Sequence, residues 1–364
     1  MWKCSIHPAF EEILVLRTFL QKKISIEYDE TLQKNEVIIG KSGAVVQQKK
    51  RLWKEIFSYF ETYAIASWMN NYDYYYLKNA LADCYRKNYD TLVVGSSYAR
   101  FGYDDKISMG HAKNLALPSQ DLYYASKIVK KCKNGHRNSI KNIIIGLGYY
   151  SFYSDLSKTE NEKELSRISN VYNPIFEDTH NAIILPPQVG IKQSSVWDMQ
   201  SILNYFSNRI YNSIQGEYFS VIHDRKKCKT VMWKDFSKEW NEISADDRER
   251  AGQQRAQLHN KEIGYYESYI ENIAILDQLI EQCERENIKL YICVFPVTKE
   301  YSKYIDKQMI DNFWNALSCA KGEIHVLDLN ECECFGLNDF NDMDHLSAVG
   351  AQKATMLINE AIGI

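Results

Sequence analysis

The chain has 364 residues, of which 45% are hydrophobic, and its 44 basic residues nearly balance its 47 acidic ones. This length and composition allow one domain with additions around a sizeable core. The near balance of charge gives no electrostatic reason to expect a nucleic-acid partner. No run of about 18 apolar residues occurs, so we expect no membrane span.

The N-terminal stretch "MWKCSIHPAFEEILVLRTFLQKK" has acidic residues before a short apolar run. It lacks the basic start and the small-residue cleavage site of a signal peptide. The 9 cysteines are odd in number and show no framework spacing, which indicates reduced thiols. Together these features predict a cytoplasmic protein.

Helical periodicity dominates residues 1–88, where apolar residues recur every three or four positions in "AFEEILVLRTFLQKK" and "RLWKEIFSYFETYAIASWM". The pattern then changes to strands. Three apolar runs predict buried strands, "TLVVG" at 91–95, "KNLAL" at 113–117 and "NIIIGLG" at 142–148. After the second run, Ser119 is the predicted N-cap of the helix "QDLYYASKIVKKC".

A polar segment from residue 151 to about 262 interrupts this alternation and predicts an insertion or cap, with a helix in "QSSVWDMQSILNYFSNRIYNSI". Helices and strands then alternate again, as helix 265–287, strand 288–296, helix 304–320, strand 323–329 and helix 346–362. Such alternation implies a doubly wound parallel sheet, whose sites lie at the carboxyl ends of its strands. We therefore expect a mainly helical N-terminal extension, 1–88, and an α/β domain, 89–364.

Ser97 stands just past the first predicted strand, in Gly95-Ser96-Ser97, where the next helix begins. Free backbone N–H groups and the helix dipole favour a negative charge at such a place. A serine there can serve as a nucleophile. The alternative is that the three small residues only form a tight turn and cap the helix.

The second notable stretch, Asp342-Met343-Asp344-His345, follows the last predicted strand. An Asp three residues before a His can fold back, accept the Nδ1 hydrogen and leave Nε2 facing outward. A general base needs this orientation to deprotonate a serine. An acidic loop with a surface histidine is the alternative. Because these strands end on the same rim of a doubly wound sheet, we expect His345 to lie near Ser97.

Gly95-Ser96-Ser97, together with Asp342-Met343-Asp344-His345 and the following Gly350, resembles the SGNH (GDSL-type) hydrolase superfamily over 91–150 and about 265–362. The resemblance implies a flavodoxin-like three-layer α/β/α sandwich with a parallel sheet. It also implies a nucleophile, Ser97, a general base, His345, and an orienting carboxylate, Asp342. Asp344 is a second carboxylate near the same imidazole, but the spacing favours Asp342. The helical extension and the helical insertion lie outside the resemblance.

Two other blocks of the superfamily are altered in this chain. Ser119, in "NLALPSQ", stands where the family has a glycine whose N–H joins the oxyanion hole. Gly148-Tyr149-Tyr150 stands where the family has Gly-x-Asn, so a tyrosine replaces the asparagine. We expect the oxyanion hole to consist of the N–H groups of Ser97 and Ser119, with Tyr150 as a third donor and Tyr149 lining the substrate pocket.

Further residues are expected near the same rim of the sheet. Arg100, one helical turn beyond Ser97, either pairs with a carboxylate or binds substrate. Thr298 and Tyr301, in "FPVTKEY" after the fourth predicted strand, are expected to line the pocket. His259, near the end of the insertion, is expected to be a polar loop residue. No phosphate-binding glycine loop, HExxH or paired CxxC occurs, and we predict neither a cofactor nor a metal.

These features predict a serine esterase. The Gly-Ser-Ser form and the strand end "GLGYYSF" are similar to relatives associated with surface-polysaccharide modification, which implies O-acyl (acetyl) esters of carbohydrate as substrates. One alternative is an O-acyltransferase in which a sugar hydroxyl replaces water on the same triad. Another is a non-catalytic binding protein on the same fold, because the asparagine is lost. The expected partner is a small-molecule or carbohydrate ester.

Overall fold

A computed structural model describes three stretches of the chain, residues 72–134, 140–186 and 240–364. The chain divides into two compact units, Met1–Asn79 with Gln188–Tyr218 and Ala80–Pro187 with Phe219–Ile364. The sheet and the site described below belong to the second unit. The helices predicted upstream of residue 72 and in "QSSVWDMQSILNYFSNRIYNSI" lie outside the described residues.

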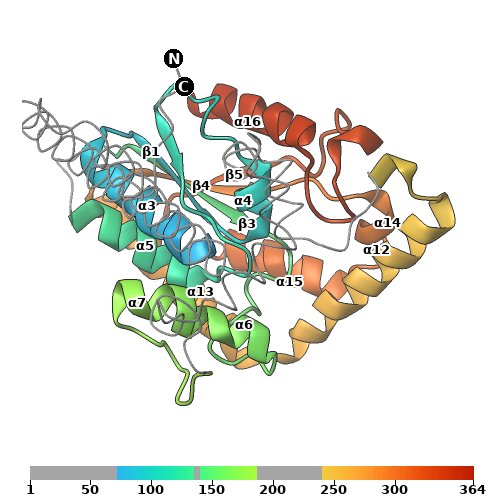
Figure 1. The fold of residues 1–364 in the computed structure, drawn as a ribbon, viewed down its shortest axis with the longest axis horizontal. Coiled ribbons are helices and arrows are strands. Elements are labelled where there is room, and N and C mark those ends of the chain that lie inside the picture. Colours follow the sequence, from blue (N-terminus) through green and yellow to red (C-terminus); the bar gives the residue numbers. More distant parts are fainter. Residues whose placement is uncertain (1–71, 135–139, 187–239) are drawn as a thin grey trace, which may run out of the picture. The chain divides into compact units, whose positions relative to one another are not determined.

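One parallel sheet is the centre of the second unit (Figure 1). Its strands are β1 Thr91–Gly95, β2 Ala112–Asn114, β3 Asn142–Leu147, β4 Lys289–Val294 and β5 His325–Asp328. Across the sheet their order is β2-β1-β3-β4-β5, and each neighbouring pair is parallel. The predicted α/β class is thereby confirmed. The order reverses between β1 and β3, which is where a sheet of this kind leaves a crevice at its carboxyl edge.

β2 is shorter than the predicted strand at 113–117. The chain still follows β1, because Leu115 N–H donates to the Val93 carbonyl at 2.7 Å. The regular ladder ends at Asn114, whose side-chain amide donates to the Ala99 and Tyr103 carbonyls at 3.0 and 2.8 Å. The Leu117 N–H also donates to the Gly95 carbonyl at 3.2 Å, so the rest of the predicted run lies along β1 outside the regular strand.

The helices alternate with these strands as the sequence predicts. The described α-helices are α3 Tyr72–Arg86, α4 Ser97–Gly102, α5 Leu122–Asn134, α6 Glu162–Arg167, α7 Asn173–Phe176, α12 Ala245–Asn260, α13 Tyr266–Arg285, α14 Lys299–Ser302, α15 Lys307–Ser318 and α16 Ala348–Ile362. Shorter turns are the π-helix η1 Ile168–Tyr172 and the 3-10 helices η3 Trp240–Glu242, η4 Lys261–Gly264 and η5 Leu337–Asp339. The predicted helices at 265–287, 304–320 and 346–362 correspond to α13, α15 and α16.

The predicted N-cap of α5 is wrong by two residues. Asp121 takes this place, since its Oδ1 accepts the Tyr124 N–H at 2.9 Å and its carbonyl accepts the Ala125 N–H at 3.0 Å. Ser119 instead has a φ of +53°, in the left-handed region. A cap residue adopts an extended backbone, so Ser119 belongs to the turn that precedes the helix. Both residue types favour caps, and only the path of the turn distinguishes them.

Both faces of the sheet are covered by other elements. Every residue of β1 and β3 is buried, as expected for parallel strands with helices on either side. Val93 and Ile144 share one apolar cluster with Ala99 of α4 and with Ala354 and Ile358 of α16. α5 packs against β1 and α13. None of the described helices is long and apolar enough to cross a membrane.

α12, from the second half of the predicted insertion, runs beside α14 at the right of Figure 1. Gly252 permits this approach, because a Cβ there would lie 2.2 Å from the Glu300 carbonyl oxygen. The helix is strongly polar, but it buries Gly252, Ala256 and His259. These three positions are separated by four and three residues, so they form one face of the helix. That face brings α12 to the carboxyl edge of the sheet.

Candidate active site

Ser97 is the first residue of α4 and follows directly after β1. The side chain of Ser96, the N-cap, accepts the Tyr98 N–H at 3.4 Å. Gly95 has a φ of +119°, and a Cβ there would lie 2.3 Å from the Gly146 carbonyl oxygen on β3. Only glycine can therefore make the turn that presents Ser97 this close to the neighbouring strand.

His345 lies in a tight loop between η5 and α16. The Asn341 N–H donates to the His345 carbonyl at 2.8 Å, and an antiparallel bridge joins Phe340 to Leu346. These two contacts close the loop at its base, so residues 342–344 lie beside the imidazole. This fold-back is the one that the Asp-x-x-His spacing predicts.

Ser97, His345 and Asp342 form a chain of hydrogen bonds. His345 Nε2 lies 2.7 Å from Ser97 Oγ, and Nδ1 lies 2.9 Å from Asp342 Oδ1 and 3.1 Å from its Oδ2. Asp342 Oδ1 also accepts the N–H groups of Asp344 at 3.0 Å and of His345 at 2.8 Å, which fixes the carboxylate. The structure thus brings together the three side chains singled out in the sequence. A serine, a base and an orienting carboxylate in this order are the elements of an activated nucleophile.

The surroundings of His345 favour its charged form despite burial. Burial opposes the imidazolium, but the carboxylates of Asp342 and Asp344 outweigh it and raise the pKa of His345 above its ordinary value of 6.5. The rings of Phe101 and Tyr98, both on α4, lie 5.6 and 5.7 Å from the imidazole centroid. The side chain is only 3% exposed, so its contacts fix the plane of the ring.

Asp344 places a second carboxylate beside the same imidazole nitrogen. Its Oδ1 lies 3.2 Å from His345 Nδ1, slightly farther than Asp342 Oδ1. Its Oδ2 accepts the Nε–H of Arg255 on α12 at 2.9 Å and the Tyr98 hydroxyl at 3.4 Å. Asp342 has the closer contact, while Asp344 joins the imidazole to a guanidinium. Sequence reasoning did not identify Arg255.

The expectation that His259 is a polar loop residue is wrong. His259 is buried within α12, its Nδ1 lies 2.5 Å from the Tyr301 hydroxyl, and its ring stacks on Tyr150 with centroids 4.0 Å apart. Burial, helped by the Arg255 charge, lowers the pKa of His259 to about 3, so this imidazole is neutral at neutral pH. The signal available in the sequence was the spacing of four between Arg255 and His259, which places both on one helical face.

Ser119 and Tyr150 border a small pocket at the carboxyl ends of β1 and β3, together with Gly95 and Ser96. The left-handed backbone of Ser119 is one that glycine adopts more readily than serine. Burial raises the pKa of Tyr150 and outweighs the nearby Ser96 hydroxyl, which acts in the opposite direction, so the phenol stays protonated. Two of the expected oxyanion residues therefore lie beside the residue that precedes Ser97.

Thr298 and Tyr301 lie beside the His345 loop and the Tyr98 hydroxyl, and neither borders the small pocket. The hydroxyl and the N–H of Thr298 donate to the Met343 carbonyl at 2.8 and 3.0 Å, which joins the His345 loop to the start of α14. Tyr301 is buried, with its hydroxyl 3.5 Å from that of Tyr98. Thr298 supports the loop, whereas Tyr301 is part of the polar cluster around the imidazole.

Tyr149 packs against α15, and Arg100 lies beside the Phe101 ring on α4. The Tyr149 hydroxyl accepts the Asn330 side-chain N–H at 3.1 Å, and its ring meets the edge of Phe313 on α15 at 5.3 Å. These contacts hold Tyr149 against α15 and the loop after β5. Arg100 is buried on α4, with its guanidinium carbon 5.9 Å from the Phe101 ring.

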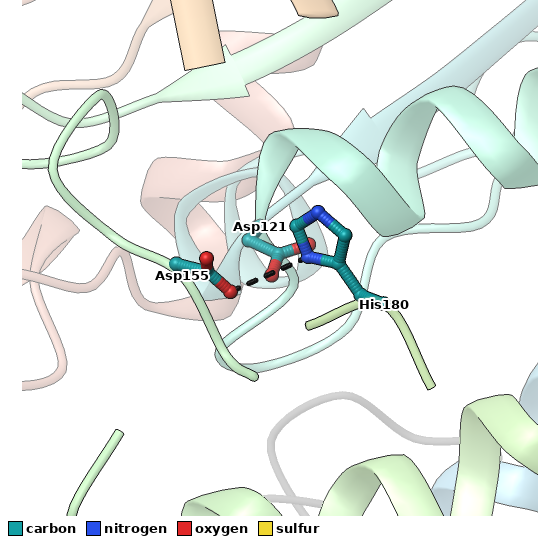
Figure 2. Close-up of side chains that lie close together, drawn as sticks. All are labelled: Asp121, Asp155 and His180. Atoms are coloured by element: carbon teal, nitrogen blue, oxygen red, sulfur yellow. Dashed lines mark ion pairs between the residues drawn. The ribbon is translucent and has the colours of Figure 1, made fainter. Parts of the chain in front are cut away.

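A second polar cluster lies at the start of α5. Figure 2 shows Asp121, Asp155 and His180 pointing toward one another. His180 Nδ1 lies 3.4 Å from Asp155 Oδ1, and its Nε2 lies 3.0 Å from Glu271 Oε1 on α13. Although burial opposes its charge, the carboxylates of Asp155, Asp121 and Glu271 raise the pKa of His180. The cluster joins the segment after β3 to α5 and α13.

Two groups of side chains among the described residues have ligand atoms close enough to share a metal ion, Asp121 with Asp155 and His180, and Asp342 with Asp344 and His345. In the first, the two carboxylate oxygens of Asp121 already accept the N–H groups of Tyr124 and Leu156, each at 2.9 Å. In the second, His345 Nε2 faces Ser97 rather than the carboxylates. Both groups have the contacts of hydrogen-bond networks internal to the protein.

Comparison with known proteins assigns no family to this chain. No protein-family model matches it, and no curated protein is similar enough to match. The assignment of a function therefore depends on the geometry around Ser97.

Proposed function

We propose that the chain is a serine esterase of the SGNH type, acting on O-acyl esters of carbohydrate through Ser97, His345 and Asp342. The observation that carries the proposal is the continuous chain of hydrogen bonds from Ser97 Oγ through His345 to Asp342, with contacts of 2.7 and 2.9 Å. The strand order β2-β1-β3-β4-β5 also supports the flavodoxin-like three-layer sandwich of that superfamily.

The proposed reaction has two steps, in which Ser97 is the nucleophile and His345 transfers the protons. Ser97 Oγ attacks the ester carbonyl carbon while His345 Nε2 takes the hydroxyl proton. The bond to the leaving alkoxide then breaks, and His345 returns the proton to that oxygen. Water then attacks the acyl carbon while His345 takes one of its protons. The bond between that carbon and Ser97 Oγ breaks, His345 returns the proton to Oγ, and the carboxylic acid leaves. Asp342 holds the tautomer with hydrogen on Nδ1 and stabilises the imidazolium in both steps.

The oxyanion requires donors where its charge develops. Ser97 is at the N-terminus of α4, so its N–H has no partner from a preceding helical turn. Ser119, in the turn before α5, borders the pocket next to Ser96. We assign the oxyanion hole to these two N–H groups and give Tyr150 the place of the family's asparagine.

An O-acyltransferase on the same triad is the second candidate. The observation that favours it is the burial of the reacting groups, because Ser97 is 6% exposed and His345 is 3% exposed. A site that excludes water can favour a bound hydroxyl over hydrolysis. The two reactions share every step up to the acyl-enzyme.

The deciding experiment is covalent labelling of Ser97. A fluorophosphonate probe should label the wild type, and Ser97→Ala should abolish labelling and turnover of p-nitrophenyl acetate without changing the melting temperature much. Ser318→Ala, in the last turn of α15, removes an exposed hydroxyl and should behave as wild type. Full labelling of Ser97→Ala would rule out this serine as the nucleophile. Added methyl glycosides would accelerate p-nitrophenol release and yield O-acetyl glycosides only if the enzyme transfers.

A further inference from the structure

α12 extends a charged side chain into the site. Arg255 of α12 donates from Nε to Asp344 Oδ2 at 2.9 Å. The side chain of Asp344 is 2% exposed and that of Arg255 is 31% exposed, so the guanidinium reaches a buried carboxylate from the partly open side. The segment that carries Arg255 lies outside the part of the chain that resembles the superfamily.

Two carboxylates compete for one imidazole nitrogen. Asp342 Oδ1 and Asp344 Oδ1 lie 2.9 and 3.2 Å from His345 Nδ1. Each negative charge favours the imidazolium, and an imidazolium cannot accept the Ser97 proton. Two uncompensated carboxylates would therefore leave the base protonated over a wider pH range. Arg255 binds Asp344 on the side away from the imidazole nitrogen and offsets that charge.

Among the described residues, three charged groups act most strongly on His345. From its own loop they are Asp342 and Asp344, and from α12 the group is Arg255. His259, also on α12, is neutral at neutral pH because burial lowers its pKa to about 3.

Uncharged residues of α4 also contact the imidazole. These residues are Ser97, Tyr98 and Phe101, and the Tyr301 hydroxyl of α14 lies 3.5 Å from the Tyr98 hydroxyl. Burial raises the pKa values of Tyr98 and Tyr301, so both hydroxyls keep their protons.

We propose that the Arg255–Asp344 ion pair is a positioning device for His345, through which α12 holds the imidazole toward Ser97 and keeps it able to accept a proton at neutral pH. This inference rests on the proposed function, since it assigns a role within the same triad. Arg255 and Asp344 touch the base rather than the reacting atoms, so they are positioning residues. In the wild type, two carboxylates and one guanidinium lie around the imidazole, so the net charge of these groups is about −1.

The test is the pH dependence of kcat/KM for p-nitrophenyl acetate in the wild type and four variants. Arg255→Gln leaves two uncompensated carboxylates and should move the acidic midpoint up by about one pH unit, with about a tenfold loss below both midpoints and recovery at high pH. Asp344→Asn should move the midpoint down. The double variant restores the net charge and should return close to wild type, and Arg255→Lys, which keeps the charge, should rescue the midpoint.

An acidic midpoint that is the same in all these proteins would overturn the proposal, even if kcat or KM changed, because a merely structural Arg255 would lower activity at every pH. A readout without turnover separates this result from failure of the proposed function. The His345 ring titration can be followed by NMR in Ser97→Ala, with and without Arg255→Gln. The same upward shift is expected there, and an unshifted titration refutes the charge coupling even if the protein is no esterase.

Discussion

Replacing Asp342 by asparagine tests which carboxylate orients the base. Asp342 Oδ1 accepts two backbone N–H groups, of Asp344 and His345, besides the imidazole Nδ1. An asparagine can keep all these contacts with its carbonyl oxygen. Its amide would then stand in the place of Oδ2, which lies 3.1 Å from Nδ1. The fold of the loop should survive, while the negative charge is lost and a competing donor appears.

The expected cost follows from this geometry. Where a triad has one carboxylate, the change to asparagine lowers kcat by about 10⁴, because the wrong tautomer forms and the imidazolium loses its counter-charge. Here Asp344 remains 3.2 Å from Nδ1 and keeps part of that stabilisation. We therefore expect a loss of about 10³ for Asp342→Asn, or ~4 kcal/mol in the activation free energy. Asp344→Asn should cost less than about tenfold at the high-pH plateau.

The assay is kcat for p-nitrophenyl acetate on the high-pH plateau, with the melting temperature of each variant measured beside it. An unchanged melting temperature for Asp342→Asn would show that the loop has kept its fold. The reasoning is refuted if Asp344→Asn is the more damaging change, because Asp344 would then be the orienting carboxylate. Equal small losses in both would mean that either carboxylate suffices.

Two further predictions concern the pocket and the polar cluster at α5. Tyr150→Phe should lower kcat and kcat/KM together if the Tyr150 hydroxyl helps to bind the oxyanion. The control is Tyr149→Phe, which removes only the hydrogen bond with Asn330. Identical kinetics in the two variants would exclude the donor role of Tyr150. His180→Gln should destabilise the fold by about 1–2 kcal/mol at pH 6 and by less at pH 9. The reason is that the pKa of His180 is raised in the folded state, so the stability it contributes is complete below pH 6.5 and is lost as the pH rises through the folded-state pKa. Chemical denaturation at both pH values measures this difference, and an equal loss at both would contradict a charged His180 beside Asp155.

Local patterns in the sequence were enough to predict much of the sheet and the contact between Asp342 and His345. The run "TLVVG" predicts β1, because a short apolar run that ends in glycine is typical of a buried strand followed by a turn, and Gly95 does have a φ of +119°. The Asp-x-x-His spacing predicts the contact between Asp342 and His345, because three residues of a tight turn bring the two side chains together. Both relations involve residues close together in the chain.

The sequence was less informative where several choices had similar local energies. Ser119 and Asp121 are both good helix caps, and only the turn after β2 decides that Asp121 takes the position. The regular strand predicted at 113–117 ends at Asn114, whose amide bonds the Ala99 and Tyr103 carbonyls, although Leu115 and Leu117 still donate to β1. These differences depend on hydrogen bonds to residues that local propensity does not include.

By itself, the sequence determined the α/β alternation, the position of Ser97 after the first strand and the pairing of His345 with Asp342, because each depends on periodicity or on spacing within one turn. Only the tertiary structure decided that α12 supplies Arg255 and His259 to the same place. Their nearest partners, Asp344 and Tyr301, are 89 and 42 residues away along the chain. No local pattern encodes such distances, since they arise from packing the α12 face with Gly252 against α14.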